Sequence, residues 1–242
     1  MKMPHEKYIS DDYIRQNPSW DSEDSPWKVE FIAAVLRTAN LMPDSICEVG
    51  CGAGGVLAGL RCMYPHTELY GYDIAPAVAQ FWKKHEQSNI RFYVGDFFCL
   101  NKKTYDLILL LDVIEHVVDP FNFLSQLNGS AKWYLFHFPL DLSAINVLRE
   151  KPILSVRKNV GHIHYFTKNL ALSLLKECGY DIIEWRYTGA TFNVPRRTWR
   201  TMLASLPRRL AYAVHKDWGV RALGGETLFV LARDQNDINK EE

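Results

Sequence analysis

Short apolar runs alternate along the chain with segments whose apolar residues recur at helical spacing. The continuous run at residues 107–111 is typical of a central parallel strand that is buried on both faces. Seven strands are predicted, at residues 45–49, 69–73, 89–94, 107–111, 133–138, 181–188 and 227–232. Because helical segments separate most of these strands, the pattern predicts an α/β protein with a doubly wound seven-stranded sheet.

Capping residues, prolines and glycines mark where the predicted helices begin and end. The helices are expected from Ser25-Pro26 to about Asn40, from the glycine turn to just before Pro65, over residues 76–86, from Asp119-Pro120, and from Thr167 to Gly179. Pro207 is expected to open a second helix within the segment before the last strand.

The first predicted strand leads directly into a glycine-rich turn, with the sequence ICEVGCGAGG at residues 46–55. Glycine permits a tight turn and lets a ligand approach bare backbone. The helix that follows directs its free N–H groups at that ligand and favours a carboxylate or phosphate. Asp73 ends the second strand and can accept hydrogen bonds from ribose hydroxyls, while Asp96 and Phe97 offer an acceptor and an aromatic face to adenine. Together these features predict a nucleoside-cofactor site.

The pattern resembles class I S-adenosylmethionine-dependent methyltransferases, through residues 48–54, Asp73, residues 95–97 and the run from Tyr105 to His116. That run, with residues 161–167, is particularly similar to the ubiquinone-biosynthesis O-methyltransferases. The resemblance implies a Rossmann-like sheet of order 3-2-1-4-5-7-6 with strand seven antiparallel. It assigns S-adenosylmethionine to a site formed by Glu48, Gly50, Gly52, Asp73, Ile74, Asp96, Phe97 and Leu111.

Within that implied site, the resemblance gives six residues an expected role. Gly50 and Gly52 would hold the methionine moiety, to which Leu111 would offer its backbone. Asp73 would bind the ribose, and Asp96 and Phe97 would bind and flank adenine.

A dinucleotide cofactor is the alternative, because Gly50, Gly52 and Gly55 also match the spacing G-x-G-x-x-G. That motif is weak by itself. Glu48 within the first strand and the Glu115-His116 pair after the fourth belong to the methyltransferase pattern instead, and no dehydrogenase acid–base set is evident.

Transfer of a methyl group to a hydroxyl requires that the hydroxyl lose its proton, and a histidine suits that task. His116 follows the fourth strand at the carboxyl edge of the sheet and is the predicted catalytic base; orienting the loop or contacting cofactor is the alternative role. Glu115 is expected to brace the turn. The acceptor is predicted to be a small molecule methylated on oxygen, with C- or N-methylation, or a catalytically silent cofactor-binding relative, as alternatives.

Four further residues are predicted to line the substrate pocket: Trp27, His137, His162 and His164. His162 and His164 could form a metal site with His116 or His137. No carboxylate cluster accompanies them, however, and hard cations prefer oxygen ligands. No metal is predicted.

The composition and charge of the chain limit the kinds of molecule that it is expected to bind. The 242 residues fit a single domain, with 48% hydrophobic residues for a core and 28 basic residues balancing 28 acidic ones. No nucleic-acid partner is predicted from that balance, and the five cysteines are expected as reduced thiols in a cytoplasmic protein.

Three segments fall outside the predicted sheet: an N-terminal arm at 1–26, expected to act as a lid, and substrate-side insertions at 140–161 and 190–224. Residues 196–221 are basic and amphipathic, so they are expected to cover the sheet, to form a lid or dimer contact, or to touch anionic lipid at the inner membrane face. The oligomeric state is left open.

Overall fold

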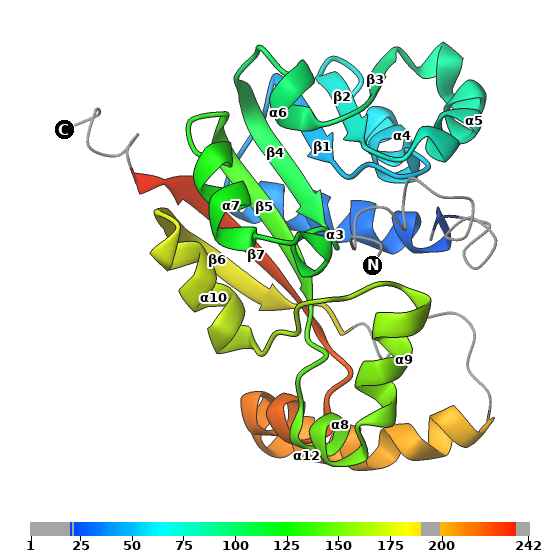
Figure 1. Ribbon diagram of the computed structural model, residues 1–242, viewed down its shortest axis with the longest axis vertical. Coiled ribbons are helices and arrows are strands. Elements are labelled where there is room, and N and C mark those ends of the chain that lie inside the picture. The colour runs from blue at the N-terminus through cyan, green and yellow to red at the C-terminus, as the bar shows by residue number, and fades with distance from the viewer. Residues whose placement is uncertain (1–19, 21, 190–198, 236–242) are drawn as a thin grey trace.

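The computed structural model describes Trp20, residues 22–189 and residues 199–235, without the side chains of Ser22 and of 199–206. Its centre is one seven-stranded sheet (Figure 1). The strands are β1 (Ser45–Val49), β2 (Glu68–Asp73), β3 (Ile90–Val94), β4 (Tyr105–Leu111), β5 (Ala131–Pro139), β6 (Tyr180–Tyr187) and β7 (Thr227–Asp234).

The sheet has the order β3-β2-β1-β4-β5-β7-β6, and β7 runs antiparallel to both of its neighbours. The predicted doubly wound fold is therefore confirmed, including the direction of the last strand. Since the first five strands are parallel, their carboxyl ends meet at one edge, which is where open α/β sheets bind ligands.

Helices cover both faces of the sheet (Figure 1). The α-helices are α3 (Ser25–Thr38), α4 (Gly55–Met63), α5 (Ala79–Trp82), α6 (Phe97–Leu100), α7 (Pro120–Leu127), α8 (Ala144–Arg149), α9 (Lys151–Asn159), α10 (Lys168–Glu177) and α12 (Trp199–Leu223). The 3-10 helices are η1 (Ser22–Asp24), η2 (Pro76–Val78), η3 (Lys83–Ser88) and η4 (Ile114–His116).

Strand β4, which is apolar from Leu107 to Leu111, contributes to both cores. Ile108 and Leu110 pack with α7 and α10 on one face, whereas Leu107 and Leu109 pack with α3 and α4 on the other. This alternation is the period-two geometry of a strand buried on both sides.

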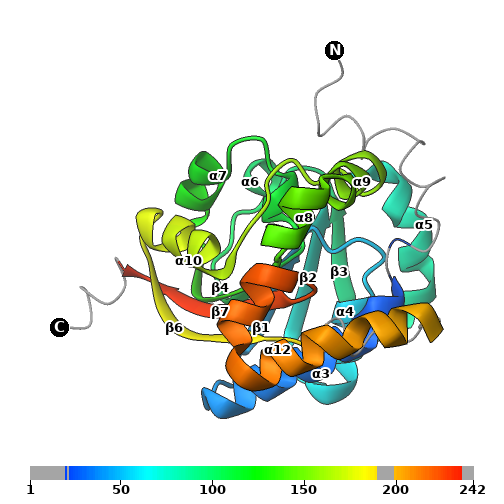
Figure 2. The same cartoon turned by 90° about the horizontal axis from the view of Figure 1, so that it is seen from below.

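The insertion at 140–161 forms α8 and α9, which lie with α12 beyond the end of β5 (Figures 1 and 2). Within α12, Pro207 does not begin a new helix as predicted. The break comes at His215, whose backbone is extended and whose Nδ1 accepts a hydrogen bond from the Trp218 N–H. An imidazole that caps the following turn thus moves the boundary away from the proline.

The helix predicted at 76–86 is also different in the structure. It is a succession of the 3-10 turns η2 and η3 around the single turn α5. At its centre the Trp82 indole N–H donates to the Gly52 carbonyl at 2.9 Å, and the ring stacks on Phe92 at 4.8 Å. These contacts hold the segment against the glycine turn, where tertiary packing overrides helical spacing.

Gly71, in the middle of β2, is required by close packing. A Cβ placed there would lie 2.8 Å from Cys51 Sγ and from Phe92 Cδ1, and 2.9 Å from Leu57 Cδ1. We predict that Gly71→Ala lowers the free energy of unfolding by about 1–3 kcal/mol, the usual cost of overpacking a core. Denaturant unfolding measures the effect. An unchanged midpoint would contradict this account of how β2 packs against α4.

Candidate active site

The glycine turn is fixed to β2 by backbone hydrogen bonds. The N–H groups of Gly50 and Cys51 donate to the Tyr72 carbonyl at 2.8 and 3.0 Å. Gly50 and Gly52 have φ values of 76° and 49°, which favour glycine because they lie in the left-handed region. The turn thereby brings bare backbone to the carboxyl edge of the sheet.

Asp73 both builds this turn and faces the space beside it. One carboxylate oxygen accepts from the Gly52 N–H at 2.8 Å and the other from the Ala75 N–H at 2.9 Å. Burial raises the pKa of Asp73, and these two N–H donors oppose the rise. Each oxygen has a second lone pair, so the carboxylate can still accept from a diol such as ribose.

A cavity of about 580 Å³ opens beside Asp73 at the carboxyl edge. This volume lies within the range of small-ligand and cofactor sites. The cavity is lined by Trp20, Val49, Gly50, Tyr72, Asp73, Ile74, Gly95, Asp96, Phe97, Phe98, Cys99, Asp112, Val113, His116, Val117, Val118, Asp119, Asn122, Phe123 and Gln126.

Six predicted site residues line this cavity together: Gly50, Asp73, Ile74, Asp96, Phe97 and His116. The other seven predicted site residues do not line it: Glu48, Gly52, Leu111, Trp27, His137, His162 and His164. The arm is represented at the cavity by Trp20, and residues 1–19 and 21 are outside the described part of the chain.

The end of the cavity near the turn suits an anion. Helix α4 begins after Gly54, and no described side chain caps its first turn. Its N–H groups and positive dipole end are thus available to a carboxylate such as that of a methionine moiety. The Trp20 ring lies over Gly52, where a Cβ would approach Trp20 Cδ1 to 2.6 Å.

The end of the cavity near β3 is aromatic. Phe97 is buried and meets Tyr72 edge to face at 5.2 Å. Asp96 caps α6, with Oδ1 accepting from the N–H groups of Phe98 and Cys99. Asp96 is predicted to accept a hydrogen bond from adenine. In the structure the same carboxylate also caps α6.

Two predicted cofactor residues are buried beneath the cavity. Leu111 lies in the core at the end of β4. Glu48 is buried in β1, where desolvation raises its pKa to about 8; the neighbouring Asp73 adds to the rise and Lys28 opposes it.

Asp112 is a cavity residue that was not singled out from the sequence. It adopts φ 56° just after β4, with one oxygen 2.7 Å from Lys28 Nζ and the other 2.7 Å from His137 Nδ1. Burial opposes ionisation, but these two groups hold the pKa of Asp112 well below its usual range. The available signal was its position at the end of an apolar strand, which Asp73 shares at the end of β2.

His137 belongs to this buried network and not to the cavity wall. Its Nε2 lies 2.6 Å from Thr227 Oγ1, and its ring packs edge to face on Trp27 at 5.7 Å. The predicted contacts of Trp27 and His137 with substrate remain predictions. His164 is half-buried on the loop before α10.

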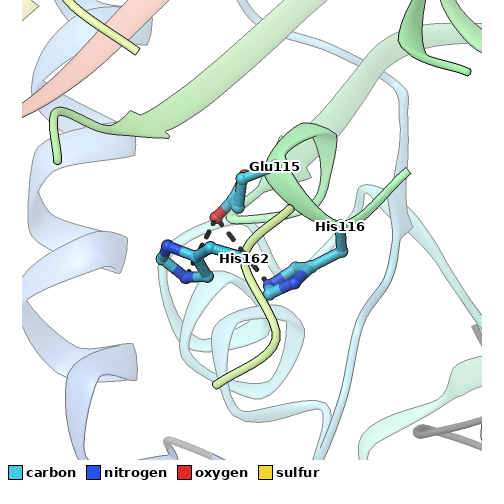
Figure 3. Close-up of side chains that lie close together, drawn as sticks. All are labelled: Glu115, His116 and His162. Atoms are coloured by element: carbon cyan, nitrogen blue, oxygen red, sulfur yellow. Dashed lines mark ion pairs between the residues drawn. The ribbon is translucent and has the colours of Figure 1, made fainter. Parts of the chain in front are cut away.

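His116 lines the cavity and lies in a cluster with Glu115 and His162 that was not predicted from the sequence (Figure 3). Its Nε2 lies 3.9 Å from Glu115 Oε1, and His162 Nε2 lies 4.0 Å from the same oxygen. Burial and the nearby Asp112 raise the pKa of Glu115. These three side chains are the one group in the described part of the chain with the geometry to hold a metal ion.

Comparison with known families identifies the family of the chain. The model of a family described as "Methyltransferase domain" matches residues 27–185. The chain therefore belongs to the methyltransferase domain family. The match confirms the predicted enzyme class, an S-adenosylmethionine-dependent methyltransferase, and with it the predicted cofactor. A comparison with curated proteins returns no significant match.

Solved structures share the fold. The plantazolicin methyltransferase, crystallised with S-adenosylhomocysteine and a substrate analogue, is 16% identical and has a TM-score of 0.64, with 96% of this chain and 93% of that chain covered. The magnesium protoporphyrin IX methyltransferase from Synechocystis, crystallised with S-adenosylmethionine, is also 16% identical and has a TM-score of 0.55, with 86% and 78% covered.

Proposed function

We propose that the protein transfers a methyl group from S-adenosylmethionine to a hydroxyl oxygen of a small-molecule acceptor. The observation that carries the proposal is a single cavity lined by Gly50, Asp73 and His116 together. This is the arrangement in which a nucleoside cofactor and an acceptor would meet. The same resemblance that relates residues 105–116 and 161–167 to the ubiquinone-biosynthesis O-methyltransferases favours oxygen over carbon or nitrogen.

When bound, S-adenosylmethionine supplies an electrophilic methyl group on a sulfonium sulfur. In the proposal Asp73 accepts hydrogen bonds from the ribose, and the N-terminus of α4 faces the carboxylate of the methionine moiety. Trp20 and Phe97 exclude water from opposite sides of the cavity. Orientation of the two reactants by such walls contributes several kcal/mol to the rate.

In the proposal, the His116 imidazole accepts the proton of the acceptor hydroxyl. The imidazole Nδ1 faces the Gly161 carbonyl at 3.2 Å. A carbonyl can only accept, so Nδ1 carries the hydrogen and the neutral ring presents its lone pair at Nε2. In the proposal, Nε2 is therefore the atom that accepts the proton of the acceptor hydroxyl.

We predict that Asp73→Ala weakens binding of S-adenosylhomocysteine by at least tenfold, because it removes both the ribose acceptor and the bond that holds Gly52. Isothermal titration of the purified chain measures the affinity, with NADH titrated in parallel. The control is Asp44→Ala, which removes an exposed carboxylate that directly precedes β1 and does not line the cavity. Binding of NADH in place of S-adenosylhomocysteine would contradict the proposed cofactor.

We predict that His116→Ala leaves S-adenosylhomocysteine affinity within a few-fold and lowers methyl transfer by about 10²–10⁴, the usual contribution of a group that handles the proton. A screen of hydroxyl acceptors with labelled cofactor supplies the assay. Full activity of the variant across roughly pH 6–9, which spans histidine titration, would exclude this role. A screen in which only carbon or nitrogen acceptors react, or none does, would favour the alternative acceptor or a silent relative.

We further propose that the basic segment at 196–221 contacts anionic membrane, which would place the protein at the inner membrane face of the cytoplasm. Residues 196–198 lie outside the described part of the chain. Along α12, Leu210, Val214 and Trp218 are 70%, 87% and 64% exposed and follow one another at four-residue spacing. Arg209 precedes the break at His215 and Arg221 follows it, so cationic and apolar groups occur together on both parts of α12, as in interfacial helices. No helix among the described residues is long and apolar enough to cross a membrane.

For this contact we predict sedimentation with vesicles that contain anionic phospholipid, and loss of most of the bound protein in high salt. Val214→Asp should reduce binding several-fold, because it places a charge in the exposed apolar row. Equal binding of the variant, or no binding at low salt, would show that this face of α12 has another purpose.

A further inference from the structure

We propose that Glu115, His116 and His162 form a binding site for a divalent first-row transition-metal ion at the wall of the cavity (Figure 3). Their ligand atoms, one from each residue, lie within 4.8 Å of one another. Ions of this class hold imidazole nitrogen and carboxylate oxygen at about 2.0–2.2 Å, so the donors would close by a short side-chain movement. Two imidazoles favour a transition metal over magnesium or calcium, which prefer oxygen.

Tertiary hydrogen bonds hold the two histidine-bearing segments together. The backbone carbonyl of Glu115 accepts from the N–H groups of Ile163 at 2.9 Å and of His164 at 3.1 Å. The loop that precedes α10 is thereby fastened to the turn η4 that follows β4. These bonds bring His162 to Glu115 and His116, although His162 is far from both in sequence.

Both imidazoles are set in the tautomer that a metal requires. His162 Nδ1 lies 2.6 Å from Asp141 Oδ2, and His116 Nδ1 lies 3.2 Å from the Gly161 carbonyl. Because each acceptor calls for a hydrogen on Nδ1, each neutral ring presents the Nε2 lone pair. A carboxylate or a backbone carbonyl behind the ligating ring is the usual support of a metal-bound histidine.

The buried carboxylate is the independent observation that points to a ligand. The Glu115 side chain is fully buried, and neither of its oxygens accepts a hydrogen bond within the described part of the chain. Leaving a carboxylate unsatisfied in the interior is costly. Oε1 instead faces the two Nε2 atoms at 3.9 and 4.0 Å, too far for hydrogen bonds but on either side of a space that a cation would fill.

The functional part of this inference rests on the proposed methyl transfer. An ion held by three protein ligands keeps positions open toward the cavity that His116 lines. The acceptor hydroxyl would bind there and lose its proton to solvent, since a metal ion lowers the pKa of a bound oxygen. That oxygen would then form a bond to the methyl carbon as the carbon–sulfur bond breaks, leaving its electron pair on sulfur. On this account His116 Nε2 is a ligand and not a free base.

The test is titration of the untagged full chain with Co²⁺ after chelator treatment, followed by visible absorption and by calorimetry. Cys62 and Cys99 are exposed free thiols, so all proteins carry Cys62→Ser and Cys99→Ser to remove competing soft ligands. We expect one Co²⁺ per chain. Glu115→Gln and His162→Ala should weaken its binding by at least a hundredfold, and the positioning variant Asp141→Asn by about 10–100-fold.

His66→Ala is the matched control, because it removes an exposed imidazole remote from the cluster and should leave Co²⁺ binding unchanged. Absence of specific Co²⁺ uptake by the parent protein would overturn the site, as would equal uptake by Glu115→Gln and His162→Ala when circular dichroism shows both folded. Parallel titration with S-adenosylhomocysteine separates the two proposals. Its failure with Co²⁺ binding intact would reject the methyl-transfer function alone, whereas normal cofactor binding without Co²⁺ uptake would reject the metal site alone.

Discussion

The site depends on the hydrogen bond between the Asp73 carboxylate and the Gly52 N–H, because it joins the ends of two neighbouring parallel strands. Together with the bonds from Gly50 and Cys51 to the Tyr72 carbonyl, it holds the chain in a turn that only glycine adopts readily. The cost of that conformation and of burying Asp73 is offset by N–H donors that would otherwise be unsatisfied. The polar groups of the glycine turn and of Asp73 therefore satisfy one another at the edge of an apolar sheet.

A second set of tertiary contacts holds the turn after β4 and the loop before α10 in place. The Glu115 carbonyl holds the loop that carries His162, and the ion pairs of Asp112 with Lys28 and His137 hold the end of β4. Both sets of contacts lie at the carboxyl edge, where side chains from non-consecutive strands converge. The chain belongs to the methyltransferase domain family, and its cavity is lined by Gly50 and Asp73 from the first two strand ends and by His116 from the turn after β4.

Much of this arrangement could be predicted from local sequence. The apolar strands, the glycine turn and the acids after β2 and β3 each follow from the chemistry of adjacent residues, and strand order followed from the family resemblance. By contrast, helix boundaries failed wherever a distant side chain intervened. Trp82 bonded to Gly52 broke up the helix expected at 76–86, and the His215 cap moved the break expected at Pro207.

The sequence by itself thus determined the strands of the sheet and the glycine turn, because strand periodicity and glycine conformations are properties of short segments. The tertiary structure alone decided the partners of the histidines. It buried His137 against Asp112 and brought His162 to Glu115 and His116 across a separation of more than 40 residues. Such pairings depend on how β4 and the loop before α10 meet in space, and a single sequence carries no local signal for that distance.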